Sequence, residues 1–359
     1  MKTRTKDSRS PFPTFLALFL AYLLASCTQD YSGCSDCLPE LPAPIIDMHM
    51  HAVPADYQGP PPVAMCTPID PMPTWDQTTP YGLFFLNFLK NPACDDPIWS
   101  PMTDEELKER NMAVMERHNI YGVLSGIPAL VDHWITEAPG RFYPGRLFGL
   151  EEDGKTFKPK DMRDLVESGQ LDLFGEITNQ YSGILPEDNG MEPYWEMAEE
   201  LDIPVHIHVG PGPPGAIYLG FDRYEARLHS PLVLEKMLTR HPGLRVVIGH
   251  AGYPMLDDLL AVLYAHPQVY AEVGVIVFTQ PRPAFYRFLQ GIMDAGFGKR
   301  VMFGSDQMVW PEAIERAITV IEEATFLSED QKRDIFYNNA ARFLRLSEEE
   351  IGRHHGVIP

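Results

Sequence analysis

The sequence of 359 residues predicts an α/β protein, a (β/α)8 TIM barrel with a long insertion after its first strand. Two observations carry this prediction: eight short apolar runs alternate with helical stretches, and several of these runs end in a polar residue beside glycine. An open doubly wound sheet is disfavoured because no G-x-G-x-x-G turn follows the first run. The predicted strands cover residues 44–49, 121–126, 146–151, 173–178, 204–209, 245–250, 269–276 and 301–305.

The first 26 residues are predicted to be an export signal rather than part of the fold. Four basic residues precede an apolar run at residues 15–25 that is too short to span a bilayer. The run ends in Leu24-Ala25-Ser26-Cys27, which resembles the lipobox of bacterial lipoproteins. We therefore expect a signal peptide over 1–26, lipidation at Cys27, a tether over 27–43, and an extracytoplasmic protein held at the periplasmic face or cell surface by its lipid anchor.

Charge and cysteine content limit the partners and the compartment. The formal net charge of -21 repels phosphate backbones and excludes nucleic acid as an expected partner. With Cys27 lipidated, Cys34, Cys37, Cys66 and Cys94 remain, and in an oxidising compartment they predict two disulfides. Three connectivities are available, and the sequence does not rank them.

The first predicted strand closes with His49-Met50-His51. Side chains two apart in a strand point to the same side, so the two imidazoles converge and form half of a metal site. The same spacing also occurs in histidines that are only hydrogen-bonded at a strand end. Further polar residues at other strand ends support the metal site.

The insertion over residues 52–102 is rich in proline and aromatic residues and contains Cys66 and Cys94. An insertion after the first barrel strand lies beside the mouth of the barrel. Two interpretations stay open: a surface excursion held by a disulfide, or a lid whose aromatic side chains line a substrate pocket. The helix after it is predicted to begin at Thr103, which forms a capping box with Glu106. Ser230 is the predicted N-cap of a later helix, with Pro231 in its first turn.

Polar residues end four of the later strands. The carboxyl-terminal ends of barrel strands open on one face, so these residues are expected to meet there. They are Glu176 in the fourth strand, His206 and His208 in the fifth, His250 in the sixth and Asp306 in the eighth.

These motifs together resemble the amidohydrolase superfamily, most closely its amidohydrolase-related metal-dependent hydrolases, a branch that includes aromatic acid decarboxylases. The resemblance extends over a domain of residues 44–346 and leaves 347–359 as a tail, in which His354 and His355 are expected to be unstructured. The motifs are Ile46-Asp47-Met48-His49-Met50-His51, Pro204-Val205-His206-Ile207-His208-Val209-Gly210, Val247-Ile248-Gly249-His250-Ala251-Gly252, Phe303-Gly304-Ser305-Asp306 and Asn338-Asn339-Ala340-Ala341-Arg342-Phe343-Leu344.

The resemblance implies a divalent metal, zinc or manganese, held by His49, His51, His208 and Asp306. It also implies that Asp306 activates the attacking water and that His250 is a catalytic histidine that orients or protonates the substrate. Glu176 departs from the usual mononuclear pattern, so it is either a ligand for a second metal, a substrate-binding group or a buried ion-pair partner. His206 is expected one layer deeper, as a packed core histidine or a substrate contact.

The expected activity is hydrolysis of an amide, ester or lactone bond of a small molecule, because a metal of this kind lowers the pKa of bound water to about 7. The alternative is non-oxidative decarboxylation of a carboxylic acid, in which Arg223, Arg227 or Arg282 would reach the substrate carboxylate. A third reading is an inactive, surface-anchored binding protein. A homo-oligomer stays open.

Overall fold

The computed structural model describes residues 42–358. The predicted signal peptide, Cys27, Cys34 and Cys37 lie outside the described residues. Within 42–358, no helix combines the length and the apolar character needed to cross a membrane.

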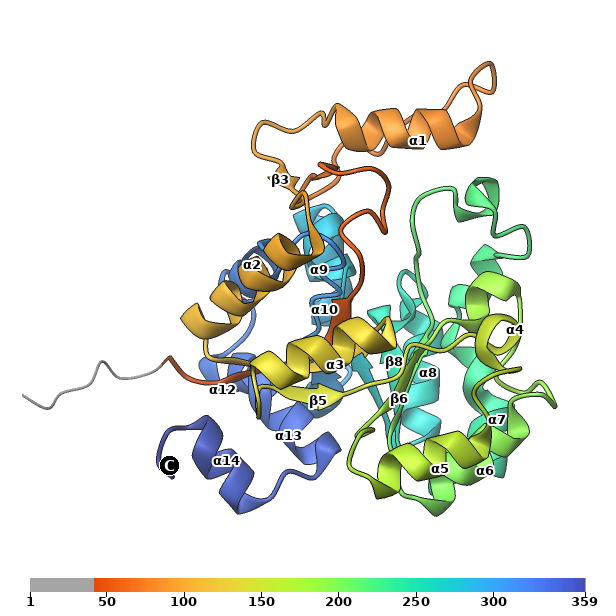
Figure 1. Cartoon of the computed structure of the whole chain (residues 1–359), viewed down its shortest axis with the longest axis vertical. Coiled ribbons are helices and arrows are strands. Elements are labelled where there is room, and N and C mark those ends of the chain that lie inside the picture. Colours follow the sequence, from red (N-terminus) through yellow and green to blue (C-terminus); the bar gives the residue numbers. More distant parts are fainter. Residues whose placement is uncertain (1–41, 359) are drawn as a thin grey trace, which may run out of the picture. The chain divides into compact units, whose positions relative to one another are not determined.

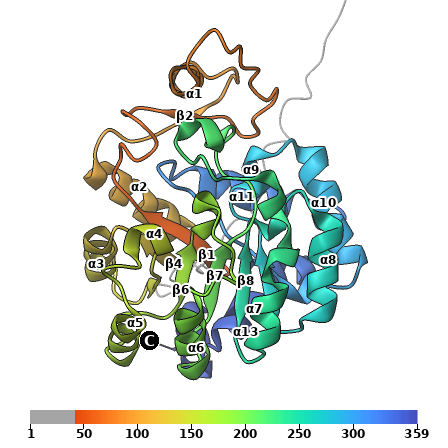
Figure 2. The same cartoon turned by 90° about the vertical axis from the view of Figure 1, so that its right-hand side faces the viewer.

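The described chain is a (β/α)8 barrel, as the sequence predicts, with the helices arranged around parallel strands (Figures 1 and 2). The strands form two parallel sheets, in the orders β1-β4-β5 and β10-β9-β8-β7-β6. Isolated bridges from Gly145 to Leu173 and from Phe148 to Ile177 join the sheets on one side. The barrel strands are β1 Ile45–Ala52, β4 Ile120–Gly126, β5 Phe142–Pro144, β6 Phe174–Ile177, β7 Val205–His208, β8 Val246–Gly249, β9 Val269–Glu272 and β10 Val301–Met302.

On the other side, β1 joins the segment that follows β10. The backbone N–H of Met48 donates to Phe303 O at 3.0 Å, and that of Asp306 donates to His49 O at 2.7 Å. The first and last strands of the barrel are therefore neighbours, which brings the start and the end of the domain together at the predicted site.

The helices follow the strands in the expected alternation. Thr103 caps α2 by accepting the Glu106 N–H, and Ser230 accepts the Leu232 N–H at the start of η4. The α-helices are α1 Tyr81–Lys90, α2 Asp104–Arg117, α3 Pro128–Glu137, α4 Leu150–Asp153, α5 Pro159–Glu167, α6 Glu192–Glu200, α7 Glu235–Arg240, α8 Leu256–Ala265, α9 Ile276–Thr279, α10 Arg282–Asp294, α11 Ala313–Glu322, α12 Glu329–Arg333, α13 Asn339–Leu344 and α14 Glu348–His354. Short 3-10 turns are η1 Asn179–Ser182, η2 Ala216–Leu219, η3 Ala226–His229, η4 Pro231–Leu234, η5 His250–Gly252 and η6 Gly298–Arg300, and η7 Asp334–Asn338 is a π-helical turn.

The third predicted strand, residues 146–151, is wrong in its bounds. The strand is β5 at Phe142–Pro144, and residues Leu150–Asp153 already form α4. Phe148, in the middle of the predicted run, is fully buried, and its ring centroid lies 4.9 to 5.9 Å from those of Phe157, Phe174 and Tyr194. Within the predicted run, Phe148 forms an isolated parallel bridge to Ile177 but no continuous strand. Its packing against neighbouring aromatic rings accounts for the rest of the apolar signal, which hydropathy alone does not distinguish from a strand.

A small apolar cluster takes residues from successive strands and from the C-terminal helices. In register, His206 of β7 pairs with Val247, a member of this cluster, whereas His208 pairs with Gly249 one step further toward the carboxyl end. His206 therefore lies one layer deeper than His208, as predicted. The buried members of the cluster are Ile46, Met48, Val123, Leu173, Val247, Met302, Tyr337, Ala340, Ala341 and Phe343.

The insertion after β1 contains the short antiparallel strands β2 (Ala64–Met65) and β3 (Ile98–Trp99) and helix α1. A disulfide joins Cys66 to Cys94, which selects one pair among the connectivities left open by the sequence. The Tyr81 hydroxyl donates to Pro214 O at 2.5 Å, so α1 is tied to the loop after β7. Whether this segment works as a lid stays a prediction.

The C-terminal residues are not an unstructured tail, and this expectation is wrong. Residues Glu348–His354 form α14, and His354 is only 4% exposed. Its Nδ1 lies 2.9 Å from the Tyr337 hydroxyl and its Nε2 3.2 Å from the Tyr143 hydroxyl, while the Tyr121 ring stacks on the imidazole at 3.6 Å. Tyr121 and Tyr143 come from a distant part of the chain, so local polarity could not reveal how the helix is anchored.

Candidate metal centre

Four side chains converge at the carboxyl-terminal ends of β1 and β6 and after β10. The Nε2 atoms of His49 and His51 lie 2.9 Å apart. Asp306 Oδ1 is 3.2 Å from His51 Nε2 and 3.8 Å from His49 Nε2. The two carboxylate oxygens of Glu176 each lie 3.5 Å from one of these nitrogens. The H-x-H spacing therefore directs both imidazoles at one point, and the predicted carboxylates meet them there.

This donor set fits a divalent metal ion. Two ligands of a tetrahedral zinc-like ion, each about 2.0 Å from it, are separated by about 3.3 Å, which matches the distances above. The Nδ1 of His49 faces Glu272 Oε1 at 3.2 Å, so the ring proton is expected on Nδ1 and the lone pair on Nε2. Asp306 Oδ1 is buried without a hydrogen-bond partner among the described residues. A metal ion between these atoms would accept the lone pairs that face each other here.

A second pair of imidazoles lies on the other side of Glu176. His208 Nδ1 is 2.6 Å and His250 Nε2 is 3.6 Å from Glu176 Oε1, and these two nitrogens are 3.0 Å apart. His250 Nδ1 donates to Gly274 O at 2.9 Å, which leaves its Nε2 free to face the carboxylate. Glu176 thus lies between two pairs of histidines.

The buried charges favour a cation at this position. Burial alone would lower the pKa of His49, but the carboxylates of Asp306, Glu176 and Glu272 outweigh it and raise that pKa well above its usual value. Burial likewise would raise the pKa of Glu176, but His49 and His208 hold it well below its usual range. The potential at His49 is therefore strongly negative, which favours either a proton or a metal ion there.

Burial lowers the pKa of His208, and the neighbouring His250 lowers it further. This keeps the His208 imidazole neutral at physiological pH. A neutral imidazole is the form that binds metal.

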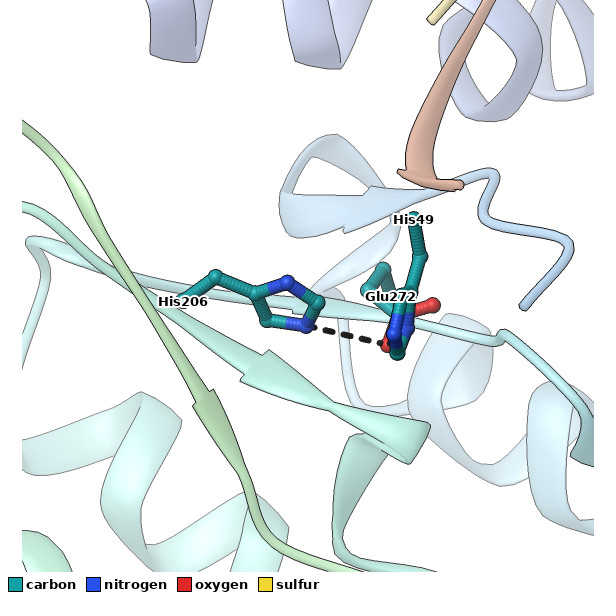
Figure 3. A group of neighbouring side chains, drawn as sticks. All are labelled: His49, His206 and Glu272. Atoms are coloured by element: carbon teal, nitrogen blue, oxygen red, sulfur yellow. Dashed lines mark hydrogen bonds and ion pairs between the residues drawn. The ribbon is translucent and has the colours of Figure 1, made fainter. Parts of the chain in front are cut away.

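Glu272, at the end of β9, was not predicted to belong to the site. It is fully buried, and its Oε1 lies 3.2 Å from His49 Nδ1 and 3.4 Å from His206 Nε2 (Figure 3). The same oxygen accepts the backbone N–H of His250 at 2.7 Å. The sequence did hold a signal for Glu272, because this residue ends a strand as the other site residues do. The predicted strand extended to residue 276, so Glu272 was not recognised as a strand end.

Gln307 is a second residue that sequence reasoning missed. Its amide oxygen accepts the His51 backbone N–H at 3.1 Å, and its amide nitrogen donates to the His51 carbonyl at 2.9 Å. Gln307 is fully buried and follows Asp306 directly. It therefore fixes the backbone of one predicted ligand from the segment that carries another, a relation that only the tertiary structure reveals.

The three candidate substrate arginines lie outside this cluster and pair with surface carboxylates. Arg223 pairs with Glu151, Arg227 with Glu225, and Arg282 with Glu323. The side chain of Arg227 is 67% exposed and that of Arg223 52% exposed. Their contacts are those of solvated surface charges.

The amidohydrolase family profile matches residues 46–346. No curated protein matches the chain. Solved structures share its fold at low sequence identity. An uncharacterized TIM-barrel protein from Bordetella bronchiseptica is 17% identical with a TM-score of 0.56, over 86% of this chain and 100% of that one.

Two solved enzymes are similar to the same extent. A probable 2-pyrone-4,6-dicarboxylic acid hydrolase from Acinetobacter baumannii, with citric acid bound, is 14% identical with a TM-score of 0.53, over 84% of this chain and 99% of that one. A 5-carboxyvanillate decarboxylase from Novosphingobium aromaticivorans, complexed with manganese, is 13% identical with a TM-score of 0.54, over 84% of this chain and 96% of that one. With the family profile spanning nearly the whole barrel, the chain belongs to the amidohydrolase family.

Proposed function

We propose that this protein is a metal-dependent hydrolase that cleaves an amide, ester or lactone bond of a small molecule. The observation that carries the proposal is the position of Glu176 between the pair His49 and His51 and the pair His208 and His250. A bridging carboxylate is typical of two-metal sites, which are widespread among hydrolases. Decarboxylation needs only one metal and gives Glu176 no role.

Bound metal supplies Lewis-acid activation of both water and the substrate carbonyl. Within this frame, Asp306 accepts the proton of the attacking water at a carboxylate oxygen and returns it to the leaving group. Asp306 Oδ1 lies 3.2 Å from His51 Nε2, so the carboxylate is beside the position proposed for the attacking water. We also propose that His250 binds the second metal through Nε2, because its Nδ1 proton is donated to Gly274 O.

Elemental analysis of the purified protein tests the metal count. We expect about two divalent ions per chain in the wild type and about one in Glu176→Gln, because the bridging group is lost. His49→Ala/His51→Ala should lose at least one ion. One ion in both the wild type and Glu176→Gln would contradict the two-metal site and favour the decarboxylase alternative. No ion, even after reconstitution with zinc or manganese, would support the inactive binding protein.

The products distinguish hydrolysis from decarboxylation. Hydrolysis of an ester or lactone releases one acid equivalent per bond near neutral pH, and hydrolysis of an amide releases an amine. Decarboxylation of aromatic acids releases carbon dioxide instead, and all three products are measured on the same metal-loaded protein. Carbon dioxide release, with neither acid from any ester or lactone nor amine from any amide, would overturn the hydrolase proposal.

We also propose that the protein is exported and lipid-anchored through Cys27. The Cys66–Cys94 disulfide supports an oxidising compartment, where such bonds persist. In a bacterial host, the wild type should take up labelled fatty acid and sediment with membranes, and Cys27→Ser should do neither. Equal labelling of the two proteins would rule out Cys27 as the anchor.

A further inference from the structure

We propose that two buried glutamines, Gln180 and Gln307, are positioning residues for the metal centre, and that each of them controls the affinity of one of its two ions. The inference rests on the two-metal site of the proposed function and goes beyond it, because it assigns a separate positioning residue to each ion. Both glutamines lie shortly after a carboxylate of the centre. Gln307 follows Asp306 directly, and Gln180 lies four residues after Glu176.

The two glutamines make the same pair of hydrogen bonds. The Gln307 amide oxygen accepts the His51 backbone N–H at 3.1 Å, and its amide nitrogen donates to His51 O at 2.9 Å. The Gln180 amide oxygen accepts the Gly210 backbone N–H at 3.1 Å, and its amide nitrogen donates to Gly210 O at 2.8 Å. A side-chain amide has the same kinds of donor and acceptor as a peptide group. Each glutamine therefore pairs with the backbone much as a neighbouring strand would.

Gln307 extends the pairing of β1 to a proposed ligand. The backbone of β1 pairs with the segment after β10 at His49, whose O accepts the Asp306 N–H at 2.7 Å. Gln307 then holds His51, the second imidazole of the H-x-H pair, through both of its backbone groups. The Gln307 backbone is itself fixed, because its O accepts the Trp310 N–H at 2.8 Å. The distance between the His51 imidazole and the Asp306 carboxylate therefore depends on this amide.

Gln180 acts in the same way on the other pair of histidines. β7 ends at His208, and Gly210 follows two residues later. A Cβ on Gly210 would come within 2.6 Å of the His250 Cβ, so the Gly210 backbone packs directly on His250. By holding Gly210, Gln180 sets how closely the end of β7 approaches His250. Gly210 O also accepts the Tyr224 hydroxyl at 3.1 Å, so we expect loss of Gln180 to have the milder effect of the two.

Both amides are buried, Gln307 completely and Gln180 to all but 5%. Burying an amide costs free energy unless its groups are hydrogen-bonded, so an apolar side chain would serve better if the role were only to fill space. The bonds of both amides go to strand ends beside histidines of the centre. The groups that position metal ligands typically affect metal affinity, and we expect the same of these two glutamines.

Zinc titration of the metal-free, full-length protein tests the inference. Zinc is added in competition with a chromogenic chelator, and the association constant of each ion is measured. Gln307→Met and Gln180→Met nearly keep the length of the side chain and remove both hydrogen bonds. Each variant should lower one constant by about tenfold or more and leave the other within about threefold. Gln290→Met, at an exposed glutamine of α10, is the matched control and should change neither.

The double variant shows whether the glutamines act on different ions. If they do, Gln180→Met/Gln307→Met weakens the binding of both ions. If one constant keeps its wild-type value in the double variant, the two glutamines act on the same ion, and the inference is wrong. A purely structural role would lower the Tm of the metal-free protein and leave both constants unchanged in the folded variants, which would also overturn the inference.

Hydrogen exchange of the wild type, measured by NMR, covers the case in which a variant does not fold. We expect the backbone amides of His51 and Gly210 to be protected already in the metal-free protein, because Gln307 and Gln180 hold them without an ion. Fast exchange that slows only after zinc is added would mean that the ion, and not the glutamines, orders these strand ends. That result would overturn the inference.

Failure of the proposed function gives a different result. If zinc binds at two sites but no ester, lactone or amide is cleaved, the hydrolase proposal fails and the titrations still test the glutamines. If the wild type binds a single ion, the two-metal site fails. The inference then predicts that Gln307→Met weakens this ion, held at His49 and His51, and that Gln180→Met does not. Equal weakening by both variants, or no ion in the wild type, would overturn it.

Discussion

The carboxylate of Glu272 contacts the imidazole of His49 on the side opposite Nε2, with Oε1 lying 3.2 Å from Nδ1. The same carboxylate accepts the backbone N–H of His250, so it orients two histidines of the centre from one buried point. Burial would raise the pKa of Glu272, but His49 and the other imidazoles around it hold that pKa well below its usual range. Such a carboxylate fixes the tautomer of a ligand histidine and strengthens its lone pair.

Glu272→Gln should therefore weaken metal binding while the fold is retained. Loss of a carboxylate behind a ligand histidine typically costs about 10- to 100-fold in metal affinity. Competition with a chromogenic chelator measures that affinity, and circular dichroism checks the fold. Glu323→Gln, a surface carboxylate paired with Arg282, is the matched control. Unchanged affinity in a folded Glu272→Gln protein would show that the carboxylate is only a structural partner.

At the scale of elements, α14 is anchored by a buried histidine. Burial lowers the pKa of His354 to about 4, from an ordinary value of 6.5. Between these two values the unfolded chain binds more protons than the folded one, so acid favours unfolding. The contribution of neutral His354 is thus fully present above pH 6.5 and is lost as the pH falls toward 4.

His354→Asn tests this dependence because asparagine does not titrate. We expect the variant to be less stable at pH 7.5 by about 1 to 3 kcal/mol, through lost hydrogen bonds and packing. From pH 6.5 to 4, its free energy of unfolding should fall less than that of the wild type, as measured by denaturant titration. His133→Asn, at a side chain 46% exposed, serves as the control. Parallel pH profiles for the wild type and His354→Asn would refute the assignment.

At the scale of the whole molecule, the site residues that could be predicted are those at the ends of barrel strands. His49, His51, His208, His250 and Asp306 come together because parallel barrel strands present their carboxyl ends on one face, a rule that needs only the order of apolar runs. Glu272 and Gln307 were not predicted because their roles depend on contacts across the barrel, to the His49 side chain and to the His51 backbone.

Where the predictions of elements failed, tertiary packing outweighed local pattern. Phe148 made residues 146–151 look like a strand although it packs among aromatic rings beyond the end of β5. Polar residues 347–359 looked like a tail although His354 packs between Tyr337 and Tyr143, of which Tyr143 lies far away in the sequence. The Cys66–Cys94 pairing likewise depends on how the insertion folds back, which spacing does not encode.

The arrangement of the proposed metal ligands also predicts how metal binding would affect global stability. His49 belongs to β1, at the start of the domain, and Asp306 follows β10, near its end, with Glu176 and His208 on strands between. An ion bound by these residues links segments that separate when the barrel unfolds. A ligand that binds only the folded state stabilises it by about 2.7 kcal/mol at 100 times its Kd.

We therefore expect metal removal by a chelator to lower the Tm of the wild type by about 4 °C for a domain of this size. His49→Ala/His51→Ala should show little difference between chelated and metal-supplemented samples, whatever its own Tm. Comparing each protein with itself, by scanning calorimetry, separates loss of metal from any direct destabilisation by the substitutions. An identical Tm with and without chelator in a wild type shown to contain metal would mean that the ion sits where the closing of β1 onto β10 does not depend on it, and this would move the site away from His49 and Asp306.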